Sequence, residues 1–86
     1  MAYRIDFKKS VSRDFKRIDH KNAKRILDAI ELDLSKHPES NPSLKGPFEG
    51  LRKFRVGDYR VIYAILDNSV LVLRVQHRKE VYKSEI

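Results

Sequence analysis

The sequence predicts an α+β domain in which two N-terminal helices pack on one face of an antiparallel sheet, with the element order β-α-α-β-β-β. Three observations support this fold class. A short stretch near the start alternates between apolar and charged residues, two stretches then repeat apolar residues at helical spacing, and three apolar runs separated by turn-forming residues follow. With 86 residues, the chain has the length of a single domain, which we place at 1–86.

The N-terminal half is expected to contain one strand and two helices. The strand is placed at about 2–7, where apolar and charged residues alternate. A short amphipathic helix is placed at about 11–19, with Ser10 as its N-cap, because apolar side chains recur there at i, i+4 and i+7. A second amphipathic helix at about 21–36 is ended by prolines, and 37–50 is expected to be a loop.

The C-terminal half is expected to form three strands, at about 51–56, 59–66 and 70–77. The first two are separated by Gly57-Asp58, which suits a two-residue turn with glycine first. The last two are separated by 67–69, taken as a three-residue connection. These hairpins make the three strands antiparallel neighbours, whereas the partner of the first strand is not fixed by the sequence.

The hairpins predict which side chains share a face. The first turn places Arg55 directly opposite Arg60. The three-residue connection places Arg60 opposite Gln76 and Ile62 opposite Arg74. A two-residue connection is rejected, because it would put an arginine among apolar residues. The predicted basic face carries Lys53, Arg55, Arg60, Arg74 and Gln76, with Ile62, Ala64, Val70 and Val72 toward its far end. The predicted apolar face, which packs under the helices, carries Phe54, Val56, Val61, Tyr63, Ile65, Leu71, Leu73 and Val75.

The opposed pair Arg55 and Arg60 needs an explanation. Like charges directly opposed on neighbouring strands cost roughly 0.2–1 kcal/mol, and the predicted basic face contains no acidic residue to offset them. We interpret the pair as a phosphate site, because the planar guanidinium donates bidentate hydrogen bonds to phosphate oxygens. The alternative is a solvated strand face with side chains spread apart.

The overall charge supports an anionic partner. The formal net charge is +7 and the sequence pI is about 9.9, which favours nucleic acid, an acidic protein or a membrane surface as partner. The basic residues gather in 8–25 and in 51–86. The first of these segments supplies candidates for binding a nucleic-acid backbone by charge, with a solvated helix face as the alternative: Lys16, Arg17, Lys24 and Arg25.

Several classes of site are not expected. The chain has no Cys, which excludes disulfides and cysteine metal sites, and no histidines at metal-ligand spacing, so neither a metal nor another cofactor is predicted. There is no glycine-rich phosphate loop. No apolar run approaches 18 residues and no signal peptide is recognisable, so no membrane association is predicted.

The segment 51–82 reads LRKFRVGDYRVIYAILDNSVLVLRVQHRKEVY, and it is accompanied by AYRIDF, RDFKRID, AKRILDAI and LKG earlier in the chain. With these stretches the sequence resembles the RelE/ParE superfamily of toxins from toxin–antitoxin modules over essentially its whole length. The resemblance implies a RelE-like fold and two alternative activities. RelE-like members are endoribonucleases, many of which cut messenger RNA in the ribosomal A site, whereas ParE-like members inhibit DNA gyrase.

The RelE-type positions in this sequence imply a set of catalytic residues: Lys53, Arg60, Arg78 and Tyr82. Further candidates for binding phosphate or RNA are Arg55, Arg74, Gln76 and Lys45. One position departs from the family pattern, because Leu51 stands where well-studied RelE-like members have a second lysine. Arg55 or Arg52 is a candidate to compensate for it.

The sequence therefore predicts the toxin of a type II toxin–antitoxin module, a cytoplasmic, metal-independent endoribonuclease. It would cleave messenger RNA, in the ribosomal A site, through attack of the 2′-OH on the adjacent phosphate. Its expected partners are a cognate antitoxin, with which it would form an oligomer, the ribosome and messenger RNA. The alternatives are a ParE-like gyrase inhibitor and a catalytically weak relative that binds RNA or an antitoxin.

Overall fold

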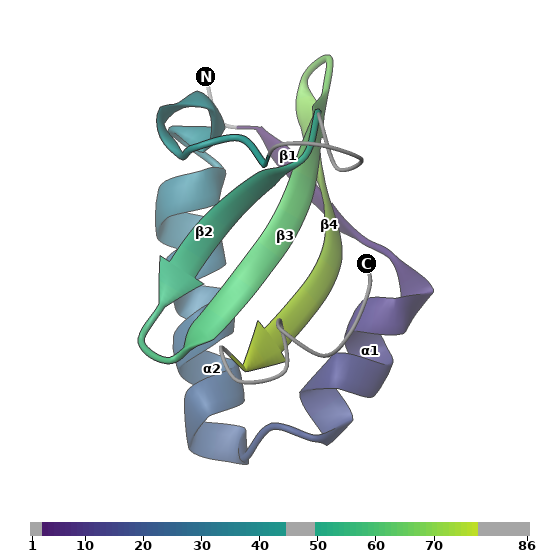
Figure 1. Cartoon of the computed structure of the whole chain (residues 1–86), viewed down its shortest axis with the longest axis vertical. Helices are drawn as coiled ribbons and strands as arrows, with labels where there is room; N and C mark the ends of the chain where they lie inside the picture. The colour runs from purple at the N-terminus through teal and green to yellow at the C-terminus, as the bar shows by residue number, and fades with distance from the viewer. Residues whose placement is uncertain (1–2, 45–49, 78–86) are drawn as a thin grey trace.

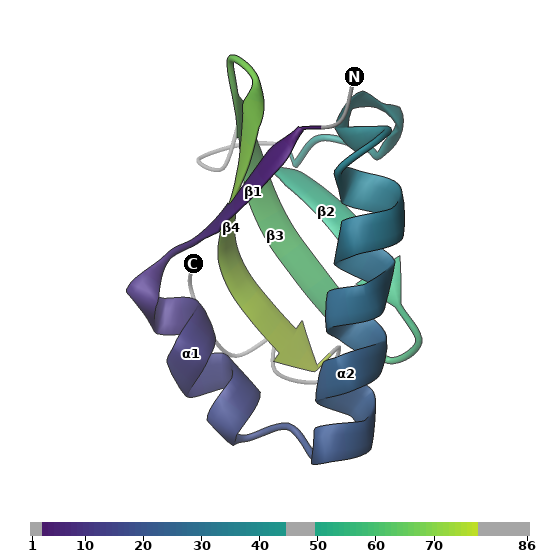
Figure 2. The same cartoon turned by 180° about the vertical axis from the view of Figure 1, so that it is seen from behind.

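A computed structural model of the chain describes residues 3–44 and 50–77. Two helices lie on one side of a four-stranded sheet with the strand order β1-β4-β3-β2 (Figures 1 and 2). The elements are β1 (Arg4–Phe7), α1 (Lys9–Lys16), α2 (His20–Ala29), a π-helical turn (Ile30–Leu34), a 3₁₀ turn (Pro38–Ser40), β2 (Arg52–Val56), β3 (Tyr59–Leu66) and β4 (Ser69–His77). The predicted order β-α-α-β-β-β is confirmed.

The sheet is mixed, so the prediction of a wholly antiparallel sheet is wrong for one pair of strands. β2, β3 and β4 are antiparallel neighbours, as predicted, but β1 runs parallel to β4 along Ser69–Val72. A parallel pair needs a long crossover connection. Both helices and the first two strands of the meander lie between β1 and β4 in sequence, and they supply that crossover.

Both helices begin slightly earlier than predicted, at Lys9 and His20, and the N-cap of α1 is a different residue. Lys8 occupies the N-cap of α1, and Ser10 lies inside the first turn. The Ser10 hydroxyl instead donates a hydrogen bond of 2.8 Å to the backbone oxygen of Leu73 on β4. Asp19 caps α2 by accepting a 3.2 Å hydrogen bond from the backbone N–H of Asn22. The Ser10 cap is therefore wrong, because this hydroxyl is used for tertiary contact.

The pairing of β3 with β4 contains an irregularity that the sequence did not reveal. Ile62 pairs with Arg74, as predicted, but the next residue of β3, Tyr63, pairs with Val72, so Leu73 is an extra residue on β4. The connection is also one residue shorter than predicted, because Leu66 pairs with Ser69. A bulge inserts one residue and switches the alternation of a strand. The short turn and the bulge together leave the predicted partners of Arg60 and Ile62 unchanged.

The bulge changes which residues of β4 enter the core. Val70 and Val72 are fully buried in the core cluster, whereas Leu71 pairs with Ala64 and Leu73 is only half-buried. The placement of Leu71 and Leu73 under the helices is therefore wrong, and so is the placement of Val70 and Val72 on the basic face. The core contains Val11, Ile26, Ile30, Leu34, Val56, Val61, Tyr63, Val70, Val72 and Val75.

Tyr63 anchors the loop that precedes β2. Its hydroxyl donates a 2.5 Å hydrogen bond to the backbone oxygen of Pro38 and accepts one of 3.1 Å from the Asn41 side chain. Burial raises the pKa of this phenol. A buried hydroxyl with both partners supplied holds the loop on the sheet.

α1 continues the edge of the sheet where β1 ends. β1 pairs with β4 only as far as Val72, and beyond it the exposed backbone of β4 would have no partner. Ser10 bonds the Leu73 oxygen, and the Asp14 carboxylate accepts a 2.9 Å hydrogen bond from the N–H of Val75. Side chains of α1 therefore replace a strand at this edge. No helix within the described residues is long and apolar enough to span a membrane.

Candidate nucleic-acid interface

Two rows of side chains cross β2, β3 and β4 on the face of the sheet opposite the helices. One row contains Lys53, Ile62 and Arg74. The next row contains Arg55, Arg60 and Gln76. Directly opposed Cβ atoms lie about 4.5–5.5 Å apart and diagonal neighbours about 7–8 Å. Lys53, Arg55 and Arg60 therefore form a triangle of cations, which we call the cation triangle.

The cation triangle has no acidic partner in the described part of the chain. Arg55 is exposed, and its Nε donates a 3.3 Å hydrogen bond to the backbone oxygen of Gly57. Among the described residues, the side chains of Lys53 and Arg60 make neither a hydrogen bond nor an ion pair, although both are half-buried. The predicted opposition of Arg55 and Arg60 is confirmed, and its electrostatic cost is not offset within these residues.

Arg74 is in a different electrostatic situation, although it was predicted for the same face. Its guanidinium donates to both carboxylate oxygens of Asp14, at 3.0 and 3.2 Å. Asp14 is 8% exposed and also accepts the N–H of Val75. Because β4 is an edge strand beyond Val72, the Arg74 side chain can reach around it to α1. The charge of Arg74 is thus already compensated.

Asp14 was missed by reasoning from the sequence, although a signal was present. It follows Val11 by three residues and precedes Ile18 by four, so it lies on the apolar stripe of α1 instead of its charged side. A carboxylate at such a position needs a buried partner. The expectation that no acidic residue offsets the basic face therefore fails at Arg74, where the offset comes from a helix.

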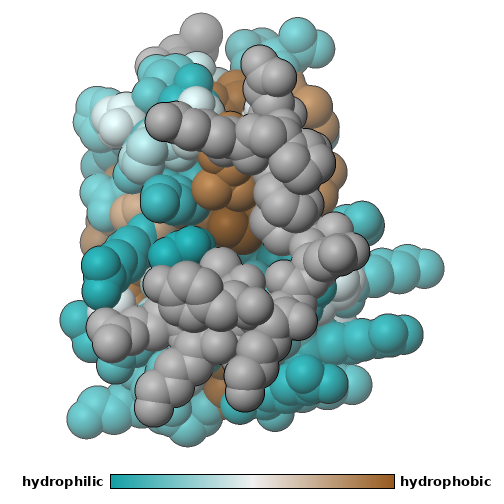
Figure 3. All heavy atoms as spheres, in the orientation of Figure 1, coloured by the Kyte–Doolittle hydropathy of each residue, from teal (hydrophilic) through white to brown (hydrophobic). Residues whose placement is uncertain are grey.

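Ile62 and Gln76, the two uncharged residues of the rows, are buried. They are 1% and 2% exposed, so neither side chain is presented to solvent. Figure 3 views the molecule from this side and shows hydrophilic residues along the lower rim of the face. The cations accessible within the two rows are those of the cation triangle and, in part, Arg74.

The four helical candidates lie apart from the cation triangle. Lys16, Arg17, Lys24 and Arg25 are all exposed and belong to α1, its C-cap and α2. The guanidinium of Arg25 lies over the turn between β2 and β3, since its Nη1 is 3.6 Å from where a Cβ on Gly57 would stand. The structure therefore separates the basic side chains into two surfaces on opposite sides of the sheet.

Comparison with known proteins decides the family. A family model described as "ParE toxin of type II toxin-antitoxin system, parDE" matches residues 5–82. Toxin RelG of Mycobacterium tuberculosis is 34% identical, over 96% of this chain and 99% of its own. The chain belongs to the RelE/ParE superfamily of type II toxins.

Solved structures of superfamily members have the same fold. The toxin–antitoxin complex RelBE2 from Mycobacterium tuberculosis contains a chain that aligns with a TM-score of 0.85 at 28% identity, covering 91% of this chain and 93% of that one. A mutant of the Escherichia coli toxin RelE in the free state aligns with a TM-score of 0.71 at 25% identity, covering 95% and 92%. The predicted RelE-like fold is confirmed.

Within the superfamily pattern, Leu51 is the departure noted from the sequence. Arg52 is poorly placed to compensate, because it pairs with Tyr63 on the helix side of the sheet. Its Nη1 donates to the backbone oxygens of Glu39 and Asn41, at 3.1 and 2.6 Å. Arg55 shares a face with Lys53 and is the better candidate.

Three predicted site residues, Lys45, Arg78 and Tyr82, lie outside the described residues. Arg78 directly follows His77, the last residue of β4. His77 itself lies on the helix side, as its alternation with Val75 predicted, and its ring packs edge-to-face on Tyr59 at 5.2 Å. Residues 3–44 and 50–77 contain no cluster of three or more acidic or histidine side chains that could hold a metal ion.

Proposed function

We propose that this toxin is a metal-independent endoribonuclease that acts in the cytoplasm and cleaves messenger RNA in the ribosomal A site. The observation that carries the proposal is the cation triangle, in which Arg55 and Arg60 are directly opposed without an acidic partner among the described residues. An arrangement that is unfavourable in the free protein becomes favourable when a phosphate group lies between the two guanidinium groups.

The proposed reaction needs no cofactor. A base takes the proton of the 2′-OH, the 2′-oxygen attacks the adjacent phosphorus, and the bond from phosphorus to the 5′-oxygen breaks. The 5′-oxygen then receives a proton, so the products are a 2′,3′-cyclic phosphate and a 5′-hydroxyl. A positioned acid or base contributes typically 10²–10⁴-fold, and one charge-stabilising donor roughly 10²–10³-fold.

The residues divide these tasks according to their chemistry. Arg60 and Arg55 stabilise the charge that develops on the phosphoryl oxygens, because guanidinium groups donate hydrogen bonds and do not exchange protons readily. Lys53 stands on the same face and is the candidate general base. The superfamily resemblance assigns the leaving-group end of the reaction to Arg78 and a substrate-orienting role to Tyr82.

The proposed partners follow from the relatives. RelBE2 is named as a toxin–antitoxin complex, and we propose that this chain is likewise held inactive by a cognate antitoxin with which it forms an oligomer. The exposed cations of the two helices are proposed to dock on ribosomal RNA by charge, which makes association with ribosomes strongly salt-dependent.

A second candidate function is inhibition of DNA gyrase. The observation that favours it is the family match itself, because the matching model is that of the ParE toxin. The absence of the second family lysine at Leu51 also leaves open a member with weak catalysis. The cation triangle favours the nuclease over both.

Toeprinting of a translated message with the purified protein tests the proposal. New cleavages within the codon in the A site are expected with the parental protein and not with Arg60→Ala. Arg4→Ala is the matched control, because Arg4 is exposed on β1 and its charge is paired with Asp6. Intact RNA together with gyrase-dependent DNA breaks would replace the nuclease by the second candidate.

A further inference from the structure

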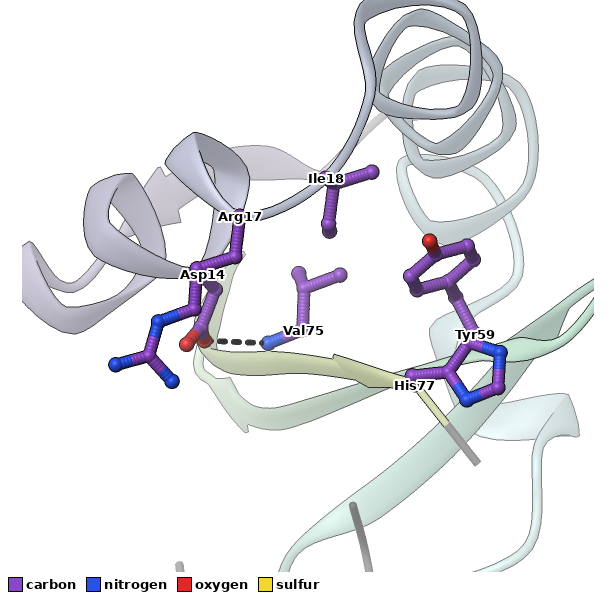
Figure 4. Close-up of a pocket in the computed structure, with 6 residues that line it drawn as sticks. All are labelled: Asp14, Arg17, Ile18, Tyr59, Val75 and His77. Atoms are coloured by element: carbon purple, nitrogen blue, oxygen red, sulfur yellow. Dashed lines mark hydrogen bonds between the residues drawn. The ribbon is translucent and has the colours of Figure 1, made fainter. Parts of the chain in front are cut away.

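Two small cavities lie on the helix side of the sheet, where β4 ends and β3 begins. The first has a volume of about 160 Å³ and is lined by Asp14, Arg17, Ile18, Tyr59, Val75 and His77 (Figure 4). The second has a volume of about 200 Å³, and its lining includes Asn22, Arg25, Gly57, Asp58, Tyr59 and His77. Tyr59 and His77 line both cavities, so both cavities lie against this pair of side chains.

The first cavity has the size and walls of a site for one flat ring. Ile18 and Val75 face the rings of Tyr59 and His77 across it, while the guanidinium of Arg17 points away (Figure 4). The lining is not wholly apolar, because Asp14 and Arg17 also belong to it. A cavity of roughly 150 Å³ is large enough for one ring of the size of benzene. A cavity of this volume therefore accommodates a six-membered ring and is small for a fused pair of rings.

The second cavity supplies groups for the rest of a nucleotide. Arg25 makes no hydrogen bond or ion pair in the described part of the chain, and its guanidinium lies over the Gly57 backbone beside the cavity. Such a group binds phosphate through charged hydrogen bonds. The carboxylate of Asp58 suits the hydroxyls of a ribose, since carboxylates accept hydrogen bonds from ribose hydroxyls in nucleotide sites.

We propose that the two neighbouring cavities together bind a pyrimidine nucleotide, with the base in the first cavity and the ribose and phosphate in the second. This site lies on the other face of the sheet from the cation triangle but at the same end, because Tyr59 and Arg60 are consecutive on β3. The nucleotide is either free or part of an RNA strand that passes around the hairpin end. An RNA strand as the source of the nucleotide rests on the proposed nuclease function.

Titration with uridine 5′-monophosphate, followed by NMR, tests the site. We expect saturable binding with intermolecular NOEs from H5 and H6 of the base to the methyl groups of Ile18 and Val75. Ribose 5-phosphate should give no such contact, and adenosine 5′-monophosphate should bind more weakly because its base is larger. Absence of NOEs to these methyls, or tighter binding of the adenosine nucleotide, overturns the proposal.

Two variants separate the phosphate contact from general attraction. Arg25→Gln should weaken the binding of uridine 5′-monophosphate by roughly tenfold or more, the effect of a lost charged hydrogen bond, and leave uridine binding unchanged. Arg13→Gln is the control, because Arg13 is an exposed arginine of α1 that lines neither cavity. Equal weakening by both variants overturns the phosphate assignment and with it the proposal.

The same binding assay answers two further questions: whether the nucleotide site exists independently of the proposed nuclease activity, and whether its nucleotide is free or part of an RNA strand. Lys53→Met removes the proposed general base but should leave uridine 5′-monophosphate binding unchanged, so failure of cleavage and failure of the site are read separately. An uncleavable 2′-O-methyl oligouridine that binds more tightly than the mononucleotide supports an RNA strand as the source. Equal affinities support a free nucleotide.

Discussion

Two arginines on the same face of the sheet, Arg60 and Arg74, differ in what surrounds them. Arg60 stands in the middle strand opposite Arg55 and has no acidic partner in the described residues. Arg74 stands on β4 where that strand becomes an edge, and Asp14 holds it with two hydrogen bonds. Residue type and face are therefore not enough to identify a functional cation. The position of the strand in the sheet decides whether a neighbouring element can supply a counter-charge.

The largest expected effect is loss of cleavage in Arg60→Ala. The rate of cleavage should fall roughly 10²-fold or more, because a charge-stabilising donor is lost. Stability should be unchanged or rise by at most a few tenths of a kcal/mol, since the substitution removes a like-charge pair. Single-turnover cleavage on programmed ribosomes and urea unfolding measure the two quantities.

The control for this prediction is Arg4→Ala, which should change neither quantity. If Arg60→Ala unfolds the domain, then Arg60 is structural, like Arg74, and the contrast between the two arginines disappears. If the variant folds and cleaves at the parental rate, the phosphate site lies elsewhere.

The second prediction concerns the partnered arginine. Asp14→Ala should lower the free energy of unfolding by about 2 kcal/mol, because it removes a buried acceptor of the Val75 N–H together with both bonds to Arg74. This loss of stability is smaller than that expected for a fully buried ion pair, because the Arg74 side chain is 27% exposed and remains partly hydrated.

A double-mutant cycle measures how strongly Asp14 and Arg74 interact. Arg74→Ala should also be destabilising, and the two substitutions together should be less so than the sum of their separate effects, because they remove one shared interaction. Urea unfolding of the four proteins gives the coupling free energy. A coupling near zero would show that the ion pair contributes nothing, and Arg74 would then be as available to RNA as Arg60.

Features of the fold that depend on local sequence could be predicted, whereas features that depend on contacts between distant residues could not. The opposition of Arg55 and Arg60 was predictable, because a two-residue turn fixes its own register. The bulge at Leu73 was not, since two compensating changes in one hairpin leave the predicted partners of Arg60 intact. The contact between Asp14 and Arg74 joins residues 60 positions apart, and only the packing of α1 on the edge of β4 creates it.

A third arginine tests whether a location on the helix side already excludes a role in catalysis. Arg52→Ala should lower the free energy of unfolding by about 1 kcal/mol, because its guanidinium bonds two loop carbonyls, and should leave cleavage unchanged. Parallel unfolding and cleavage measurements check this. A tenfold loss of cleavage with unchanged stability would instead make Arg52 the residue that compensates for Leu51.

The smallest expected effect concerns Asp19, the second carboxylate of the basic N-terminal segment and the exposed counterpart of Asp14. Hydrogen bonds from the Asn22 side chain and backbone hold the pKa of Asp19 below its ordinary value of 3.8. A carboxylate with a lowered pKa in the folded state stabilises the protein above its ordinary pKa, and this contribution is lost as the pH falls through the folded value.

Asp19→Asn keeps a helix-capping residue but has no charge to titrate. The urea midpoint of the parental protein should therefore fall slightly more than that of Asp19→Asn between pH 6 and about pH 2.5. Parallel pH dependences would mean that the cap acts through its hydrogen bonds alone, without a contribution from its charge.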